Sequence, residues 1–192
     1  MKLLLSVIIL ILSQQTLTNA DDIKDLEIEG ISIGDSLMKH MTIERYNEFK
    51  ETQYEYIHTY ATIKVKVDNL DLYDQVRAYY KIKDNNKIIR SVEGNLRTSS
   101  IEQCLDLMNK VTVDLDKSYK NYKTDLNIYD HWADKSKKSK VHEINYELDS
   151  GDSITIQCVD WSKKIQNENG WLDSFRVTLF DKETSDFLIS LN

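Results

Sequence analysis

The residues that most suggest ligand binding lie in two short segments of the carboxyl-terminal half, 131–136 and 160–162. Each segment holds a tryptophan beside a carboxylate, and the first also holds a lysine. Aromatic rings next to carboxylates and amides are typical of surfaces that bind glycans or peptides, and the same rings also complete cores. The candidate binding residues are therefore Trp132, Asp134, Lys135, Asp160 and Trp161.

The strands expected around these segments bring them together. A turn at 149–152 joins two strands, so residues near 141 fall opposite residues near 160 in an antiparallel pair. We therefore expect the loop 131–139 to lie beside Asp160 and Trp161, with Asp134 and Asp160 as a carboxylate pair. In the alternative interpretation, the loop only covers the end of the sheet and Trp161 anchors it.

Gly34-Asp35-Ser36-Leu37 resembles the nucleophile motif of GDSL esterases. That chemistry needs a histidine base held by an aspartate, usually as Asp-x-x-His near the carboxyl end. Ile128 and Ser139 stand three residues before the last two histidines, so this spacing is missing. Ser36 is therefore expected to cap a helix, and a hydrolase that uses Ser36 remains an alternative.

Two other motifs are incomplete. Asp149-Ser150-Gly151 resembles the aspartic protease motif, but a single copy would need a homodimer, and Asp-Ser-Gly-Asp is also common in hairpin turns. His142-Glu143 begins a zinc-binding motif, but Tyr146 stands where the second histidine belongs. We expect no metal and no cofactor. The lysine-rich run 135–140 is expected to be a solvated loop, although it could also bind an anionic surface.

The amino terminus has the three parts of a secretory signal peptide. Met1-Lys2 is basic, Leu3 to Leu12 is apolar except for one serine, and Thr18 and Ala20 are small residues before the expected cleavage point. Cleavage after Ala20 would release the chain into the periplasm or outside the cell. The only two cysteines, Cys104 and Cys158, are then expected to form a disulfide.

Composition limits the class of protein. The chain has 192 residues, 41% of them hydrophobic and 30% charged, with a net charge of −7. These values are typical of a globular domain and argue against nonspecific nucleic-acid binding, because phosphates would be repelled. No apolar run is long enough to span a membrane in the mature chain. With five glycines and no proline, no linker is evident, so we expect one domain over 21–192.

Hydrophobic periodicity predicts an α+β domain. Two short helices follow Gly34; a helix is expected over 100–120, a loop over 121–140 and a helical turn over 184–191. Strands are expected at 54–67, 74–83, 87–96, 144–148, 154–158 and 174–181, with a bulge at Gly94. Together they predict an antiparallel sheet of five to six strands, helices packed on one face, and both cysteines pointing inward.

The segments 28–37, 131–139, 148–153 and 157–162 together resemble a family of small exported proteins from SAR11-type marine alphaproteobacteria. The resemblance implies an exported bacterial protein and its fold, and it assigns no catalytic residue. A looser likeness links the chain to BamE-like outer-membrane assembly lipoproteins and to beta-lactamase-inhibitor-like domains. The lipid-carrying cysteine of the BamE-like proteins is missing here.

These observations favour an exported, noncatalytic binding or interaction domain of the periplasm, with a protein, peptide or glycan as ligand. The alternatives are a secreted hydrolase that uses Ser36 or Asp149, and a structural protein of envelope assembly.

Overall fold

The structure is a computed structural model that describes residues 23–49, 54–56, 59–65, 70–119 and 122–190. The expected signal peptide, 1–20, lies outside the described residues. Within them, no helix is both long and apolar enough to cross a membrane.

The described helices include two short 3-10 helices near the amino terminus. Their bounds are η1 Ile23–Asp25, η2 Leu37–Lys39, α1 Ile43–Phe49, α2 Ile101–Tyr119, α3 Lys163–Asn169 and α4 Lys182–Ile189. The amino-terminal strands are β1 Glu27–Ile28, β2 Ile31–Ser32, β3 Tyr54–Tyr56, β4 Tyr60–Val65, β5 Gln75–Lys81 and β6 Ile89–Arg97. The carboxyl-terminal strands are β7 Asn127–Asp130, β8 Lys140–Glu147, β9 Ser153–Asp160 and β10 Ser174–Phe180.

The main sheet is antiparallel throughout and confirms the expected α+β class. Its eight described strands have the order β3-β4-β5-β6-β10-β9-β8-β7, while β1 and β2 form a separate small hairpin. The sheet is larger than expected for two reasons. The run expected as one strand at 54–67 contains two strands, β3 and β4, that pair with each other in antiparallel orientation, and the expected loop 121–140 contains β7. Residues 57, 58, 66 and 67 of that run lie outside the described residues. Strands β6 and β10 join the amino-terminal and carboxyl-terminal halves.

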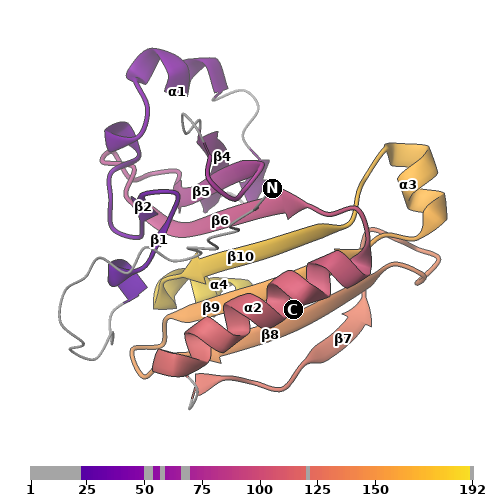
Figure 1. Ribbon diagram of the computed structural model, residues 1–192. Coiled ribbons are helices and arrows are strands. Elements are labelled where there is room, and N and C mark those ends of the chain that lie inside the picture. Colours follow the sequence, from indigo (N-terminus) through magenta and orange to yellow (C-terminus); the bar gives the residue numbers. More distant parts are fainter. Residues whose placement is uncertain (1–22, 50–53, 57–58, 66–69, 120–121, 191–192) are drawn as a thin grey trace, which may run out of the picture.

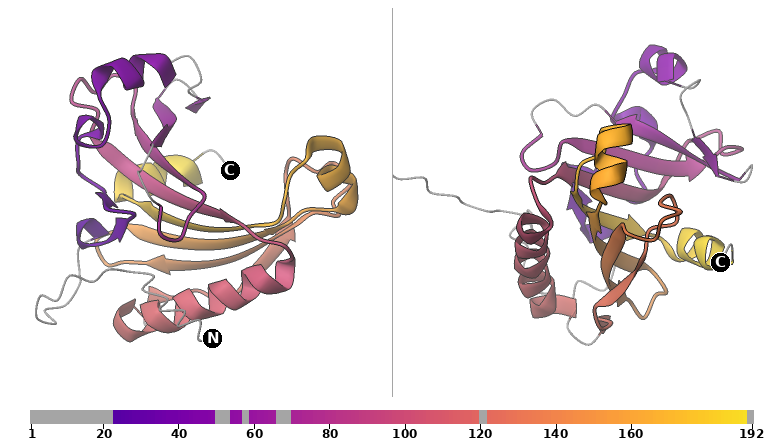
Figure 2. Two further views of the ribbon diagram at one scale, coloured as in Figure 1. Left: turned by 45° about the horizontal axis from the view of Figure 1, so that its top comes forward. Right: turned by 90° about the vertical axis from the view of Figure 1, so that its right-hand side faces the viewer.

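The core lies on one face of this sheet, and α2 covers its carboxyl-terminal half (Figure 1). Alternate sheet residues point to this face, among them Val92, Ile156, Phe175 and Val177, and all of them are buried. Helix α2 contributes its apolar stripe, which includes Met108. Helices α3 and α4 lie on the other side of the sheet (Figure 2).

The expected disulfide is present and connects the two layers of the core. Cys104 on α2 is bonded to Cys158 on β9, with a Cα–Cα distance of 5.8 Å, and both side chains are fully buried. The inward placement predicted for both cysteines is therefore confirmed.

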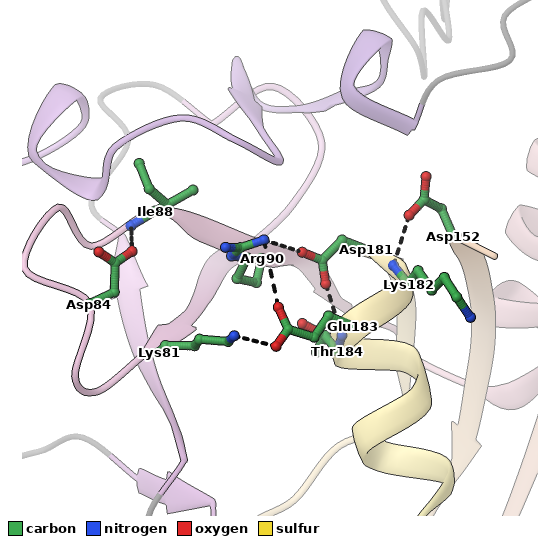
Figure 3. Close-up of polar contacts among 9 residues, drawn as sticks. All are labelled: Lys81, Asp84, Ile88, Arg90, Asp152, Asp181, Lys182, Glu183 and Thr184. Carbon is green, nitrogen blue, oxygen red and sulfur yellow. Dashed lines mark hydrogen bonds and ion pairs between the residues drawn. The ribbon is translucent and has the colours of Figure 1, made fainter. Parts of the chain in front are cut away.

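A bulge in β6 occurs at Arg90 and not at Gly94. Tyr79 pairs with Ser91 and Tyr80 pairs with Ile89, so Arg90 is the extra residue. The bulge directs its guanidinium to the start of α4, where Arg90 Nη1 lies 3.1 Å from Asp181 Oδ2 (Figure 3). Asp181 in turn caps α4 by accepting a hydrogen bond from the Thr184 backbone N–H at 2.8 Å.

Gly94 serves close packing instead. A methyl group there would lie 2.7 Å from the ring of Tyr73, which covers the backbone at this point. The turn at 84–86 is held by Asp84, whose carboxylate accepts hydrogen bonds from the backbone N–H groups of Asn86 and Ile88. Figure 3 shows the contact with Ile88. The residue with positive φ in this turn is Lys87 and not an asparagine.

Candidate functional site

Asp134 organises the loop between β7 and β8. One carboxylate oxygen accepts hydrogen bonds from the backbone N–H and the hydroxyl of Ser136, at 2.9 and 2.6 Å. The other oxygen accepts from the backbone and hydroxyl of Ser139 and from the hydroxyl of Ser162, at 2.7 to 3.0 Å. These donors, those of Ser136 first, hold the pKa of Asp134 well below its usual range. The carboxylate is therefore committed to the loop and is not free for a ligand.

Four aromatic side chains form a continuous row beside this loop, which we call the aromatic row: Trp132, His131, Trp161 and Trp171. Successive ring centroids along it are 5.7, 4.2 and 4.6 Å apart. The two inner rings, His131 and Trp161, are buried, whereas Trp132 is 88% exposed and Trp171 is 42% exposed. The row is thus supported from within and presents indole surface at both ends.

His131 is held as a neutral ring. Its Nδ1 accepts a hydrogen bond from the Ala133 backbone N–H at 3.1 Å, which leaves the proton on Nε2. Burial, together with the positive charge of nearby Arg176, lowers the pKa of His131 to about 4. The inner part of the row therefore carries no charge near neutral pH.

The predicted candidate residues are only partly brought together. Trp161 and Asp134 lie close, because Ser162, the neighbour of Trp161, bonds to Asp134, and Trp132 joins them through His131. Asp160 belongs to the opposite face of β9, because successive strand residues alternate. Burial raises the pKa of Asp160, and the negative charge of Asp173 adds to this effect. Lys135 is exposed on the loop.

Sequence reasoning missed a row of polar residues on the sheet face that is turned away from α2. Strand register places six such residues side by side across six strands, and we call them the polar ladder: Gln75, Asn95, Arg176, Gln157, Glu143 and Asn127. Each strand carries its polar residue at an ordinary alternating position, so only the register reveals the row.

The aromatic row and the polar ladder lie on the same face. Gln157 and Val159 are two positions apart in β9, and Trp161 follows two positions later, directly after the strand, so all three point to the same side of the sheet. Val159 packs with Trp161 and with Ile165 of α3 in a small second core. The effect of Arg176 on His131 also indicates that the ladder and the row are close.

Glu143 is the best connected member of the ladder. Its carboxylate accepts hydrogen bonds from Tyr129 Oη, Gln157 Nε2 and Asn145 Nδ2, at 2.7, 2.6 and 2.8 Å. Burial and the contact with Glu143 raise the pKa of Tyr129. A groove of about 570 Å³ begins at Glu143 and Gln157 and runs between β8, β9 and α4. Apolar side chains also line this groove, among them Leu188 and Ile189 of α4, so the polar ladder continues into a groove of mixed character.

The residues of the motifs considered for catalysis form hydrogen bonds within the fold. Ser36 Oγ donates to the Asn86 carbonyl at 2.8 Å and accepts from the Met38 backbone N–H at 3.3 Å, as the cap of η2. Asp35 bonds to His40 at 2.8 Å. Asp149 accepts from Tyr122 in the turn before β9. Within the described residues no group of three or more histidine, cysteine or acidic side chains could hold a metal ion.

Comparisons of the chain with protein-family models, with curated proteins and with solved structures found no significant match. Functional inference therefore depends on the site itself.

Proposed function

We propose that this protein is an exported, noncatalytic binding domain whose ligand lies across the aromatic row and the polar ladder. The observation that carries the proposal is the position of both sets on one sheet face. Exposed indole rings provide apolar contact area, and the ladder provides hydrogen-bond donors and acceptors beside them.

The rigidity of the site supports binding without a large ordering cost. The ladder lies on strands, and the loop that carries Trp132 is fixed by the hydrogen bonds of Asp134 to three serines. Buried His131 and Trp161 support the two exposed indoles from below. Preorganised side chains lose little conformational entropy when a ligand arrives.

The disulfide supports the exported location. Bonds of this kind persist in oxidising compartments such as the periplasm and are rare in the cytosol. Cys104 and Cys158 account for both cysteines of the chain. The signal-peptide pattern of residues 1–20 points to the same location.

Intrinsic fluorescence tests the binding proposal directly, because all three tryptophans belong to the aromatic row. We would titrate the oxidised protein with soluble oligosaccharides (neutral, amino and uronic-acid types) and with unstructured hexapeptides. At least one probe should change the emission and raise the melting temperature. Trp132→Ala and Trp171→Ala should weaken its binding about tenfold or more, as expected for exposed aromatic anchors.

The control is Val113→Ala, which trims an exposed apolar side chain on α2, on the other side of the sheet. It should leave binding unchanged. The proposal is wrong if no probe of either class binds, or if both tryptophan variants bind as the parent does. Mass spectrometry of the bound probe shows whether the protein cleaves it, which tests the proposal that the domain is noncatalytic. Cleavage that disappears in Ser36→Ala would establish the hydrolase alternative instead.

A further inference from the structure

Arg176 lies in the middle of the polar ladder, and no described acidic residue forms an ion pair with it. It belongs to β10, where it pairs across the strands with Asn95 on one side and Gln157 on the other. Its side chain makes no hydrogen bond or ion pair to any residue that the structure describes, and its Nε is buried without a partner. Two further arginines on this face have acidic partners: Arg77 contacts Glu93 at 3.5 Å, and Arg97 contacts Asp74 at 3.1 Å.

A partly buried guanidinium without a partner costs free energy, because water solvates it incompletely and no acceptor replaces that water. The neighbouring acid does not relieve this cost. Glu143 lies beyond Gln157 in the ladder, and its carboxylate is already bound by three neutral donors. The arrangement is therefore complete only when an anionic group reaches Arg176.

The lysine-bearing loop supplies a second, independent indication of an anionic ligand. Lys135, Lys137 and Lys138 are exposed beside Trp132, and within the described part of the chain their ammonium groups form no ion pair. The whole chain has a net charge of −7, so a positive loop at this place is a local reversal of sign. Such a loop raises the local concentration of an anionic ligand.

The remaining ladder residues favour a sugar over a protein surface. Protein interfaces have apolar centres with few charged residues, whereas every member of this ladder is polar. The amide side chains of Asn95 and Asn127 each offer both donors and an acceptor, which matches hydroxyl groups that do the same. The flat indoles of Trp132 and Trp171 provide apolar faces for sugar rings.

We propose that the site binds an acidic oligosaccharide, with a ring carboxylate on Arg176, hydroxyl groups on the neighbouring amides, and ring faces against the aromatic row. This inference rests on the proposed binding function. The guanidinium can hold a carboxylate through two parallel hydrogen bonds. A uronic acid brings one such charge per ring, which suits a protein of negative net charge better than a densely charged polyanion.

The test compares two probes with the same sugar rings, one of which lacks the carboxylate charge. Isothermal titration calorimetry of the oxidised protein would use trigalacturonic acid and its methyl ester, which keeps the rings and removes the carboxylate charge. We expect the acid to bind and the ester to bind about tenfold more weakly or worse, since a hydrogen-bonded charge pair contributes about that factor.

Two arginine variants separate binding from folding. Arg176→Met keeps an unbranched apolar stem like that of arginine and removes the unpaired charge, so it should weaken binding of the acid about tenfold or more while the melting temperature stays equal or rises. Arg77→Met is the matched control on the same face. It should lower the melting temperature, because Glu93 is buried and loses its ion pair, and it should keep the binding.

The outcomes separate the two proposals. Equal binding of acid and ester, or unchanged binding by Arg176→Met, would overturn the acidic-sugar assignment and leave the binding domain in place. Binding of a hexaglutamate peptide without binding of the uronate would show that the ligand is an acidic polypeptide, and this result would also overturn the acidic-sugar assignment. If no probe of any class binds, both proposals are wrong.

Discussion

Asp134 shows how one side chain can resemble a ligand-binding group and act within the fold. Five hydrogen bonds from three serines surround its carboxylate, and they connect the loop after β7 with the start of α3. The sequence places an aspartate between a tryptophan and a lysine, a pattern that equally suits ligand binding. The serines decide its role, because they supply hydrogen-bond donors to both carboxylate oxygens.

We predict that Asp134→Asn lowers the melting temperature by several degrees at neutral pH, because an amide replaces one acceptor oxygen with a donor that faces serine donors. The folded-state pKa of Asp134 is depressed. Its contribution is therefore fully present above the unfolded pKa of about 3.9 and is lost as pH falls through the lower folded value.

Melting curves of both proteins between pH 7 and pH 2 would check this. The gap between parent and variant should narrow only in the acidic part of that range. Ser136→Ala, which removes one of the five donors and keeps the charge, should cost less than the asparagine variant at neutral pH. A gap that stays constant down to pH 2 would contradict the assigned role.

At the scale of elements, hydrophobic periodicity predicted the strands and the helix that each bury one apolar face. The strands around Val76, Ile156 and Val177 and the helix α2 appear within a few residues of their expected bounds, because each alternates or repeats its apolar residues regularly. Strand β7 was missed because all four of its residues are exposed, so it has no apolar alternation to detect.

Helix α3 was missed although the sequence holds signals for it. Ser162 caps its start by accepting a hydrogen bond from the Ile165 backbone N–H, and Gly170 ends it with a φ of 68°. A serine followed by a short polar stretch and a glycine is a recognised start and stop pattern. The segment contains a single buried apolar residue, Ile165, so hydrophobic periodicity alone could not find it.

The close approach of Tyr73 to β6 gives a prediction about Gly94. Gly94→Ala should destabilise the protein by about 1–3 kcal/mol, a typical cost of forcing an extra methyl group into a packed site. Urea unfolding monitored by circular dichroism measures this cost. In the Tyr73→Leu background the ring is gone, so the same substitution should cost clearly less. Equal costs in both backgrounds would place the strain elsewhere.

At the scale of the whole molecule, the candidate site depends on pairing between strands that are distant in sequence. The sequence placed the loop 131–139 near Trp161 correctly, because one hairpin relates them. It could not reveal that Arg176 stands between Asn95 and Gln157, since this follows from the β6–β10 and β10–β9 registers. It also paired Asp160 with Asp134, whereas strand alternation places Asp160 on the opposite face.

The disulfide connects the helix layer to the sheet across 54 residues of chain. Replacing both cysteines with alanine should destabilise the protein by about 2–4 kcal/mol, because a crosslink over a loop of this length restricts the unfolded chain. Urea midpoints of the variant and of the parent treated with reductant should agree. A loss below about 1 kcal/mol in both would mean that the bond contributes little to stability.

The order of strands in the sheet also has a kinetic consequence. Each half of the sheet is built from hairpins between strands that follow one another, whereas β6 and β10 meet only after the whole intervening chain has been brought round. Long-range closure of this kind is slow relative to hairpin formation. The covalent link between Cys104 and Cys158 lies entirely within the later half. Formation of this disulfide can therefore stabilise the carboxyl-terminal half before it pairs with the amino-terminal half. We expect the pairing of β6 with β10 to limit the folding rate.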